Sequence, residues 1–192
     1  MRTDDWIAPS PLLHGRSPDG IWWDELENAL ARLGTVPTAR RAVDPADICR
    51  RVAVFFGLDV DTDVTAWRPS HGDLGWHTLR TDPFELVGRE AWGLAPRGHD
   101  AATLLAYSLG VPDAAAEVER RFRADLDSDD GVVAQLAVLA GLLAGADRGE
   151  HLHLVPAIHQ RVDRLIGRAT RARPARSASA RAAHEGLLLS ST

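Results

Sequence analysis

The sequence predicts a mainly helical chain with one small β-hairpin. Apolar residues recur at helical spacing through most of the chain, helix-capping residues precede several of these stretches, and only residues 77–88 read as two short extended pieces. No strand alternates with a helix in the βαβ manner. We therefore do not expect a parallel sheet.

Two helices are expected before the hairpin. Leucine and tryptophan side chains recur at helical spacing over residues 21–33, and Gly34 follows as a stop signal. Asp44 is a good N-cap and Pro45 suits the first helical position, so a second helix should begin there and continue to residue 56. This helix contains the single cysteine, Cys49, which cannot form an internal disulfide and is interpreted as a small core residue.

The region after the second helix should contain the hairpin and then helices only. Residues 58–67 read as extended or looping chain, and residues 89–98 as a loop, because glycine and proline punctuate them. The helix around residues 129–145 is apolar nearly all round, which predicts a central buried position. Its neighbours are expected over residues 99–110, 112–126 and 155–169.

Composition limits the possible partners. The formal net charge is −5, so no overall basic field attracts nucleic acid or an anionic membrane. No apolar run approaches the roughly 20 residues of a membrane span, and the first residues lack the apolar stretch of a secretory signal. We expect a cytoplasmic protein. All 22 residues of the Lys+Arg count are arginine, so no step can use a lysine amine of this chain.

Three motifs occur in an informative order: "HGDL" at residues 71–74, "FELVGRE" at residues 84–90, and "WGLAPRGHDAATLLAYSL" at residues 92–109. Together they resemble the aminoglycoside phosphotransferase family of the protein-kinase-like superfamily, over residues 20–168. The resemblance implies the helical C-terminal lobe of a kinase-like fold over residues 21–168, with the N-terminal nucleotide-binding lobe absent. Residues 1–20 would be an irregular lead-in and residues 169–192 a flexible tail, although "HEGLLLS" at its end could dock.

The resemblance assigns roles to individual residues. Asp73 matches the aspartate that orients the substrate hydroxyl during phosphoryl transfer, and His71 matches the histidine that structures the loop. Asp100 matches a buried acid that hydrogen-bonds the backbone of this loop; the alternative is an ordinary N-cap.

The metal-ligand positions depart from the family pattern. Thr78 stands where the family has an asparagine, and Gly88 where it has the aspartate that bridges Mg²⁺ to the phosphates. A hydroxyl is a weak ligand for Mg²⁺ and a glycine supplies none. Glu90 could replace the missing metal ligand, because residues 88 and 90 of an extended strand point to the same face. The alternative is that Glu90 keeps a structural role of the family's motif. The family uses ATP and Mg²⁺, but we expect neither to be bound by this chain alone.

We therefore expect a catalytically inactive, pseudokinase-like remnant. Two alternatives stay open: a non-catalytic module that binds a small polar or cationic molecule or a protein, and half of a split small-molecule kinase completed by a separate N-lobe chain. A lobe that normally packs under another would expose apolar surface, so a homodimer or a partner chain is also expected.

Several other side chains have two interpretations. His77 either contacts a substrate or packs on Trp76. His151 and His153 could suggest zinc, but a solvated or capping pair is the simpler interpretation because Glu150 is the one acid nearby. The acidic run at residues 125–130 either ends one helix and caps the next or lines a cleft. Four other tryptophans are assigned to the core: Trp22, Trp23, Trp67 and Trp92.

Overall fold

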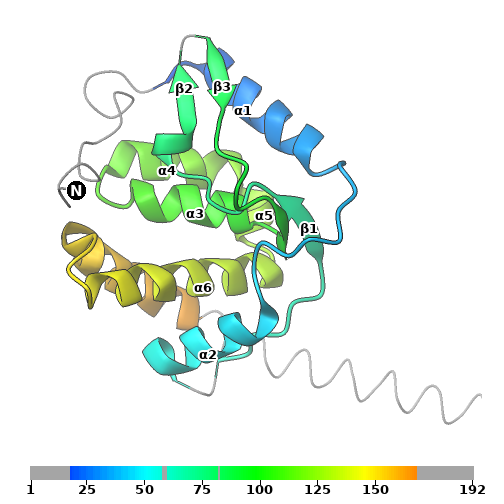
Figure 1. The fold of residues 1–192 in the computed structure, drawn as a ribbon. Coiled ribbons are helices and arrows are strands. Elements are labelled where there is room, and N and C mark those ends of the chain that lie inside the picture. Colours follow the sequence, from blue (N-terminus) through cyan, green and yellow to red (C-terminus); the bar gives the residue numbers. More distant parts are fainter. Residues whose placement is uncertain (1–17, 58–59, 82, 168–192) are drawn as a thin grey trace, which may run out of the picture.

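A computed structural model describes residues 18–57, 60–81 and 83–167. It is mainly helical, with two antiparallel two-stranded sheets, which confirms the predicted fold class (Figure 1). Residues 155–167 form a last helix. The elements before it are α1 (Gly20–Leu33), α2 (Pro45–Phe56), β1 (Trp67–Ser70), η1 (Trp76–Thr78), β2 (Leu79–Thr81), β3 (Phe84–Leu86), β4 (Gly93–Pro96), α3 (His99–Ser108), α4 (Pro112–Arg121), α5 (Arg123–Leu126), α6 (Asp129–Ala146) and η2 (Leu152–Leu154).

The central helix is α6, as its all-round apolar sequence predicts. It lies between α3 on one side and α2 on the other (Figure 1). Its side chains meet Ile48 and Val52 of α2, and Ile158 and Leu165 of the last helix, in one apolar cluster. Among the described residues, α6 is the one helix whose length and composition would suit a membrane span, but 72% of that window is buried inside the structure, as in a core helix.

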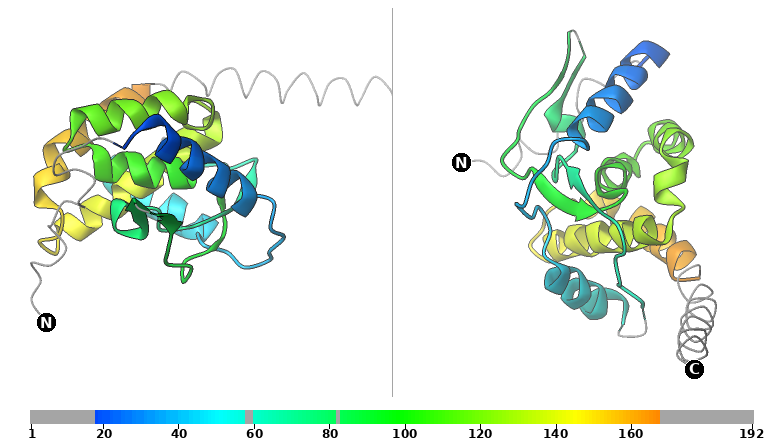
Figure 2. Two further views of the ribbon diagram at one scale, coloured as in Figure 1. Left: turned by 90° about the horizontal axis from the view of Figure 1, so that it is seen from above. Right: turned by 90° about the vertical axis from the view of Figure 1, so that its right-hand side faces the viewer.

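The hairpin β2–β3 and α1 project together from one end of the helical body (Figure 2). Tryptophan rings hold them there. Trp22 stacks on Trp76 with ring centroids 6.1 Å apart, and Trp23 meets both rings edge-on. Two of the indole nitrogens make hydrogen bonds: Trp22 donates to the Arg80 carbonyl and Trp76 donates to the Ser108 hydroxyl. Trp22 and Trp23 are therefore core residues, as expected from the sequence.

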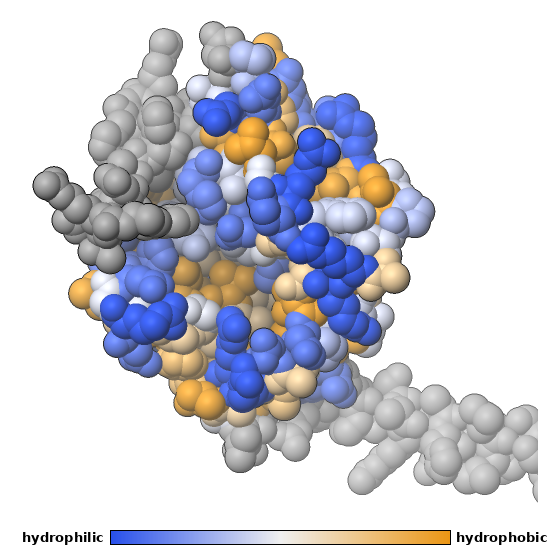
Figure 3. All heavy atoms as spheres, in the orientation of Figure 1, coloured by the Kyte–Doolittle hydropathy of each residue, from blue (hydrophilic) through white to orange (hydrophobic). Residues whose placement is uncertain are grey.

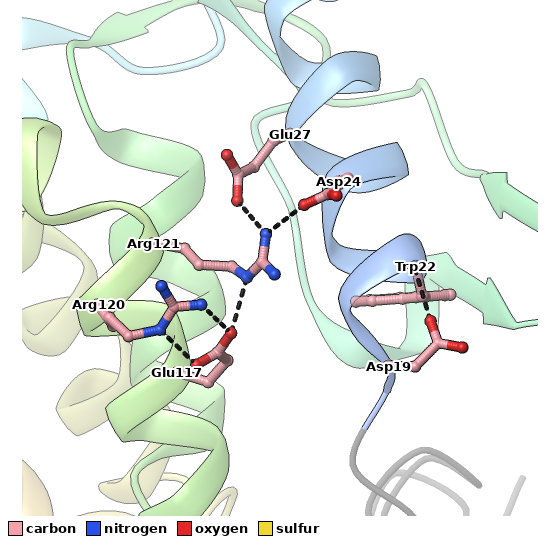
Figure 4. Close-up of polar contacts among 7 residues, drawn as sticks. All are labelled: Asp19, Trp22, Asp24, Glu27, Glu117, Arg120 and Arg121. Carbon is pink, nitrogen blue, oxygen red and sulfur yellow. Dashed lines mark hydrogen bonds and ion pairs between the residues drawn. The ribbon is translucent and has the colours of Figure 1, made fainter.

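Arg121 connects α4 to α1 (Figure 4). Its guanidinium donates to Asp24 and Glu27 of α1 and to Glu117 one turn earlier in α4, each at 2.7 Å. Hydrogen bonds from Arg120 and Arg121 lower the pKa of Glu117 to about 2. The network fixes α1 against the body at a point where the apolar cluster reaches the surface.

Three sequence predictions about local structure are wrong, and the first concerns residues 89–98. Residues 89–98 were expected to loop, yet β4 pairs antiparallel with β1, in a register that places Trp67 opposite Pro96 and Ser70 opposite Gly93. Both strands contain proline, which lacks a backbone donor and is disfavoured inside a sheet. The other edge of β4 bonds to residues 40–43 through Leu94, so Pro96 lies outside that contact.

Cys49 is not a core residue. It is exposed on α2, whose buried side chains are Ile48 and Val52. The expected helix over residues 112–126 is also interrupted, because the backbone leaves helical geometry at Phe122 and separates α4 from α5. The expectations for residues 1–17 and 168–192, including the tail, lie outside the described residues.

Candidate functional site

The His-Gly-Asp-Leu segment forms a turn between β1 and η1, and the side chain of Asp100 holds its first half. The two carboxylate oxygens of Asp100 accept from the backbone amides of His71, at 2.7 Å, and Gly72, at 3.0 Å. Asp100 lies in the first turn of α3. These are the contacts that the family resemblance implies for this residue. An ionised acceptor makes such bonds roughly twice as strong as neutral ones.

Two buried histidines pack around the same turn. The His71 ring is 1% exposed and its Nε2 lies 3.0 Å from the Val87 carbonyl, so Nε2 carries the proton and donates. The Nε2 of His99 lies 3.4 Å from the Gly72 carbonyl. Burial lowers the pKa of His99 and keeps its ring neutral, although Asp100 opposes this shift. His71 thus links the turn to the segment that follows β3.

Gly72 is required where the turn meets that segment. Its φ is +86°, and a Cβ there would lie 2.3 Å from the Ala91 carbonyl oxygen. This approach is far closer than any side chain permits. The backbone of the turn is therefore fixed by hydrogen bonds on one side and by close packing on the other.

Asp73 extends beyond the braced part of the turn. Its side chain is 55% exposed, and its Oδ2 lies 3.6 Å from Nε2 of His77. This polar contact is the main cause that lowers the pKa of Asp73 below its ordinary value, while partial burial opposes it. The His77 ring also meets Tyr107 edge-on, with centroids 6.1 Å apart. His77 thus contacts an acid and an aromatic ring of α3, which sequence reasoning had not connected to it.

The hydroxyl of Thr78 is occupied within its own turn. It donates to the Gly75 carbonyl at 2.8 Å and accepts from the Gly75 amide at 3.3 Å. Thr78 is buried. Both hydrogen-bonding capacities of the hydroxyl therefore stabilise η1, and the oxygen is poorly placed to serve a metal ion as well.

Gly88 lies beside Thr78 and Glu90. A Cβ built on Gly88 would be 3.5 Å from the Glu90 Oε2 and 3.5 Å from the Thr78 Cγ2. Residues 87–89 are not a strand and Gly88 has a φ of +79°, so the strand alternation behind the proposed Glu90 rescue does not apply. The Glu90 carboxylate nevertheless reaches the neighbourhood of Gly88.

These residues do not fit the Mg²⁺ that the resemblance implies. Magnesium prefers octahedral ligation by oxygen atoms, carboxylates among them. Of the two matched positions, Thr78 supplies a hydroxyl that is already hydrogen-bonded to Gly75, and Gly88 supplies no side chain. Among the described residues, the carboxylate found next to Gly88 is that of Glu90. Within the described residues, no group of three His, Cys, Asp or Glu side chains is arranged to hold a metal ion.

A cavity of about 340 Å³ opens beside the turn, between α2, α3 and α6. The front of the molecule is hollowed between α3 and α2 (Figure 3). Gly72, His99 and Tyr107 lie on its wall, and Gly141 and Gly145 of α6 leave room at its base. Burial raises the pKa of Tyr107, and the charges of Asp73 and Glu150 act in the same direction. The wall of the cavity is therefore electrostatically coupled to Asp73.

Acidic side chains and their arginine partners line the rim of this cavity. Asp44, Asp47, Glu150 and Arg51 lie there. Asp47 pairs with Arg50 and Arg51, and Glu150 pairs with Arg148. Sequence reasoning treated Asp44 as a cap and did not single out Asp47 or Arg51. Their spacing was the available signal, since positions 44, 47, 48 and 51 share one helical face.

His151 lines the cavity, whereas His153 is exposed. His151 has a φ of +50° and its ring meets Tyr107 edge-on, with centroids 5.5 Å apart. Burial lowers the pKa of His151. The two histidines of "HLHL" thus point to different surroundings, and His151 completes an aromatic wall with Tyr107.

The acidic run at residues 125–130 is used for structure. Ser128 caps α6 by accepting from the Gly131 amide, as expected for a cap. The buried Asp130 accepts from the amides of Thr65 and Ala66, and Asp125 pairs with Arg97. The carboxylates of the cavity beside the turn come from other segments, so the observed contacts of Ser128, Asp125 and Asp130 favour the capping interpretation of this run.

Trp67 and Trp92 are half-buried and lie near the site. Arg41 lies over the Trp67 ring, 5.2 Å from its centroid. The Trp92 Nε1 and the Nδ1 atoms of His71 and His99 are buried and have no hydrogen-bond partner among the described residues. Unpartnered buried polar atoms of this kind are costly to folding and occur where structure serves a further purpose.

Comparisons with known proteins do not assign a family. No family model, no curated protein and no solved structure matches this chain. The functional argument therefore depends on the residues and the geometry given above.

Proposed function

We propose that this chain is a relative of the aminoglycoside phosphotransferases that does not transfer phosphoryl groups by itself. The supporting observation is the contrast within one turn. Asp73 follows a backbone that Asp100, His71 and Gly72 hold in place, while the positions matched to metal ligands are Thr78 and Gly88.

The size of the deficit follows from the chemistry. Phosphoryl transfer depends on positioning and on neutralising the phosphate charge, and metal ions supply several kcal/mol of that charge stabilisation. Each loss of about 1.36 kcal/mol reduces the rate tenfold. Asp73 orients a hydroxyl and, being an anion, contributes nothing to neutralising phosphate. This chain also offers no lysine for the phosphates.

The test is ATP turnover by the pure chain with Mg²⁺ and a panel of aminoglycosides and small polyols. We expect no turnover above that of the Asp73→Ala variant. The double variant Thr78→Asn/Gly88→Asp should not restore turnover either, because one added carboxylate and one amide do not rebuild a nucleotide site. Turnover by the unmodified chain that Asp73→Ala abolishes would refute the proposal.

A second candidate function is binding without chemistry. The cavity beside the turn has three carboxylates at its rim, two of them paired with arginines, and Tyr107 and His151 form an aromatic wall. This combination suits a small, polar, cationic molecule. Aminoglycosides or small amines should then raise the melting temperature, Mg-ATP should not, and Glu150→Gln should weaken the shift while Glu25→Gln, on α1, should not.

Completion by a partner chain is the remaining proposal. A separate chain carrying a nucleotide-binding lobe would supply the missing lysine and cover the turn. Turnover that appears only when a co-purifying chain is added, and that still requires Asp73, would favour this split arrangement over the inactive one. A cytoplasmic location is compatible with each of these functions.

A further inference from the structure

A second hollow, of about 640 Å³, lies on the side of α2 that faces the last helix. We call it the apolar groove. Its wall contains Phe55, Phe56 and Leu143, and its edge contains Leu152, which is 60% exposed. The other residues around it are Ala146, Asp147, Val155, His159, Val162, Asp163 and Ile166. It shares no lining residue with the cavity beside Asp73.

The sequence supplies a segment with matching chemistry. Residues 184–190 read "HEGLLLS", in which three consecutive leucines follow a long stretch of alanine, serine and arginine. The three leucines are the largest apolar side chains in residues 168–192. A cluster of leucines at the end of a polar segment is the kind of side-chain set that an unfilled apolar groove accepts.

Charge is complementary as well. The carboxylates at the groove are Asp147 and Asp163, and no arginine lines it within the part of the chain that the structure describes. The chain between the last described helix and the leucines carries Arg168, Arg171, Arg173, Arg176 and Arg181. Passing this basic stretch over the acidic rim would favour the same placement of the leucines.

The connection is long enough. Ile166 lies at the groove and is two residues from the start of the stretch 168–186. A stretch of that length spans up to about 60 Å when extended, whereas it needs only to turn back along one helix. Because the two ends belong to one chain, docking needs no second molecule and does not depend on protein concentration.

We propose that residues 184–190 of this chain dock in the apolar groove, with the leucines against Phe55, Phe56 and Leu152. The proposal is independent of the function assigned to the Asp73 turn, because the groove lies apart from it. It assigns a ligand within the chain to a surface that would otherwise expose apolar side chains to water.

Amide hydrogen exchange of the full chain tests the docking directly. The amides of residues 187–189 should exchange at least about tenfold more slowly than in a free peptide of residues 184–192. Leu152→Asp should remove this protection, because it places a charge at the groove edge. The matched control is Val54→Asp, which alters a 72% exposed α2 residue outside the groove and should leave the protection unchanged.

A second variant keeps the proposal testable if Leu152→Asp fails to fold. Leu188→Ser/Leu189→Ser should empty the groove and raise the binding of an apolar dye several-fold, whereas Ala182→Ser/Ala183→Ser should not. Three results would each overturn the proposal: exchange of 187–189 at the free-peptide rate, protection that survives Leu152→Asp, or protection lost on dilution. The last would mean that a second copy provides the leucines.

Discussion

Two parts of one site differ in how they are held. The first, the braced segment His71–Gly72, receives hydrogen bonds and close packing from α3 and from the segment after β3. The second, the ligand positions Thr78 and Gly88, contains a hydroxyl that serves its own turn and a residue with no side chain. Under the proposed function, the comparison teaches that this loop keeps its shape while the groups that would give it phosphoryl chemistry are missing.

The reason is that shape and chemistry depend on different atoms. The braced segment contributes to folding, because two backbone amides would otherwise be left without acceptors inside the protein. A metal ligand contributes to function and usually costs stability, since like charges must gather in one place. The first kind of residue is needed in any folded version of the chain, whereas the second is needed only in an active one.

The largest expected effect comes from adding a methyl group to each part. Gly72→Ala should destabilise the protein by about 4 kcal/mol, because the Cβ would overlap the Ala91 carbonyl and φ is positive. Gly88→Ala should cost about 1 kcal/mol, since its φ is also positive but its Cβ neighbours stand at 3.5 Å. Urea unfolding of both variants measures the difference, and equal losses would remove the distinction between the two parts.

A somewhat smaller effect is expected from removing the acceptor of the braced segment. Asp100→Ala leaves the amides of His71 and Gly72 unpaired and should cost about 3 kcal/mol. Asp113→Ala is the matched control, an exposed aspartate in the first turn of α4, and should cost less than about 1 kcal/mol. If the two variants unfold at the same urea concentration, Asp100 does not brace the turn.

Replacing the Thr78 hydroxyl tests the second part of the site, the positions Thr78 and Gly88. Thr78→Val should cost about 1 kcal/mol, because the Gly75 amide loses its acceptor and the Gly75 carbonyl keeps only its bond from the Thr78 amide. The same change should leave any affinity for Mg²⁺ unaltered. A stable Thr78→Val protein with weakened Mg²⁺ binding would show that the hydroxyl is a ligand and not a cap.

The smallest effect concerns Asp73 itself. His77→Ala should raise the pKa of Asp73, since contact with His77 is what lowers it, and NMR titration of the carboxyl carbon would measure the change. A lowered native pKa adds stability above the unfolded value and loses it as the pH falls, so the contribution disappears below about pH 4. Both groups are largely exposed, and the change in unfolding free energy should be less than about 0.5 kcal/mol.

The sequence predicted most helices because their signals are local. Asp44 with Pro45, Ser128 before α6, and the apolar spacing of α1 lie within single turns of chain. The β1–β4 pair was missed because its partners lie far apart in sequence and both contain proline. Cys49 was misplaced because its neighbours Ile48 and Val52 take the buried face of α2.

Only those residues of the candidate site that belong to a short sequence motif were singled out before the structure was known. Asp73, Asp100 and the departures at Thr78 and Gly88 were assigned through the family resemblance, which depends on short motifs. The cavity could not be predicted, because Asp47, Tyr107 and Glu150 come from three segments and meet only after α2, α3 and α6 pack. The commitment of the Thr78 hydroxyl to Gly75 also required coordinates, since it depends on the conformation of a single turn.

The most direct test of the central claim is a titration of the full chain with Mn²⁺ and ATP, followed by paramagnetic broadening of backbone amide signals. Mn²⁺ takes the same oxygen ligands as Mg²⁺ and broadens signals close to its site. We predict no saturable broadening at Thr78, Gly88 and Glu90 up to millimolar ion and nucleotide. Saturable broadening of all three that requires ATP would contradict the account, because it would place a working metal site beside Asp73.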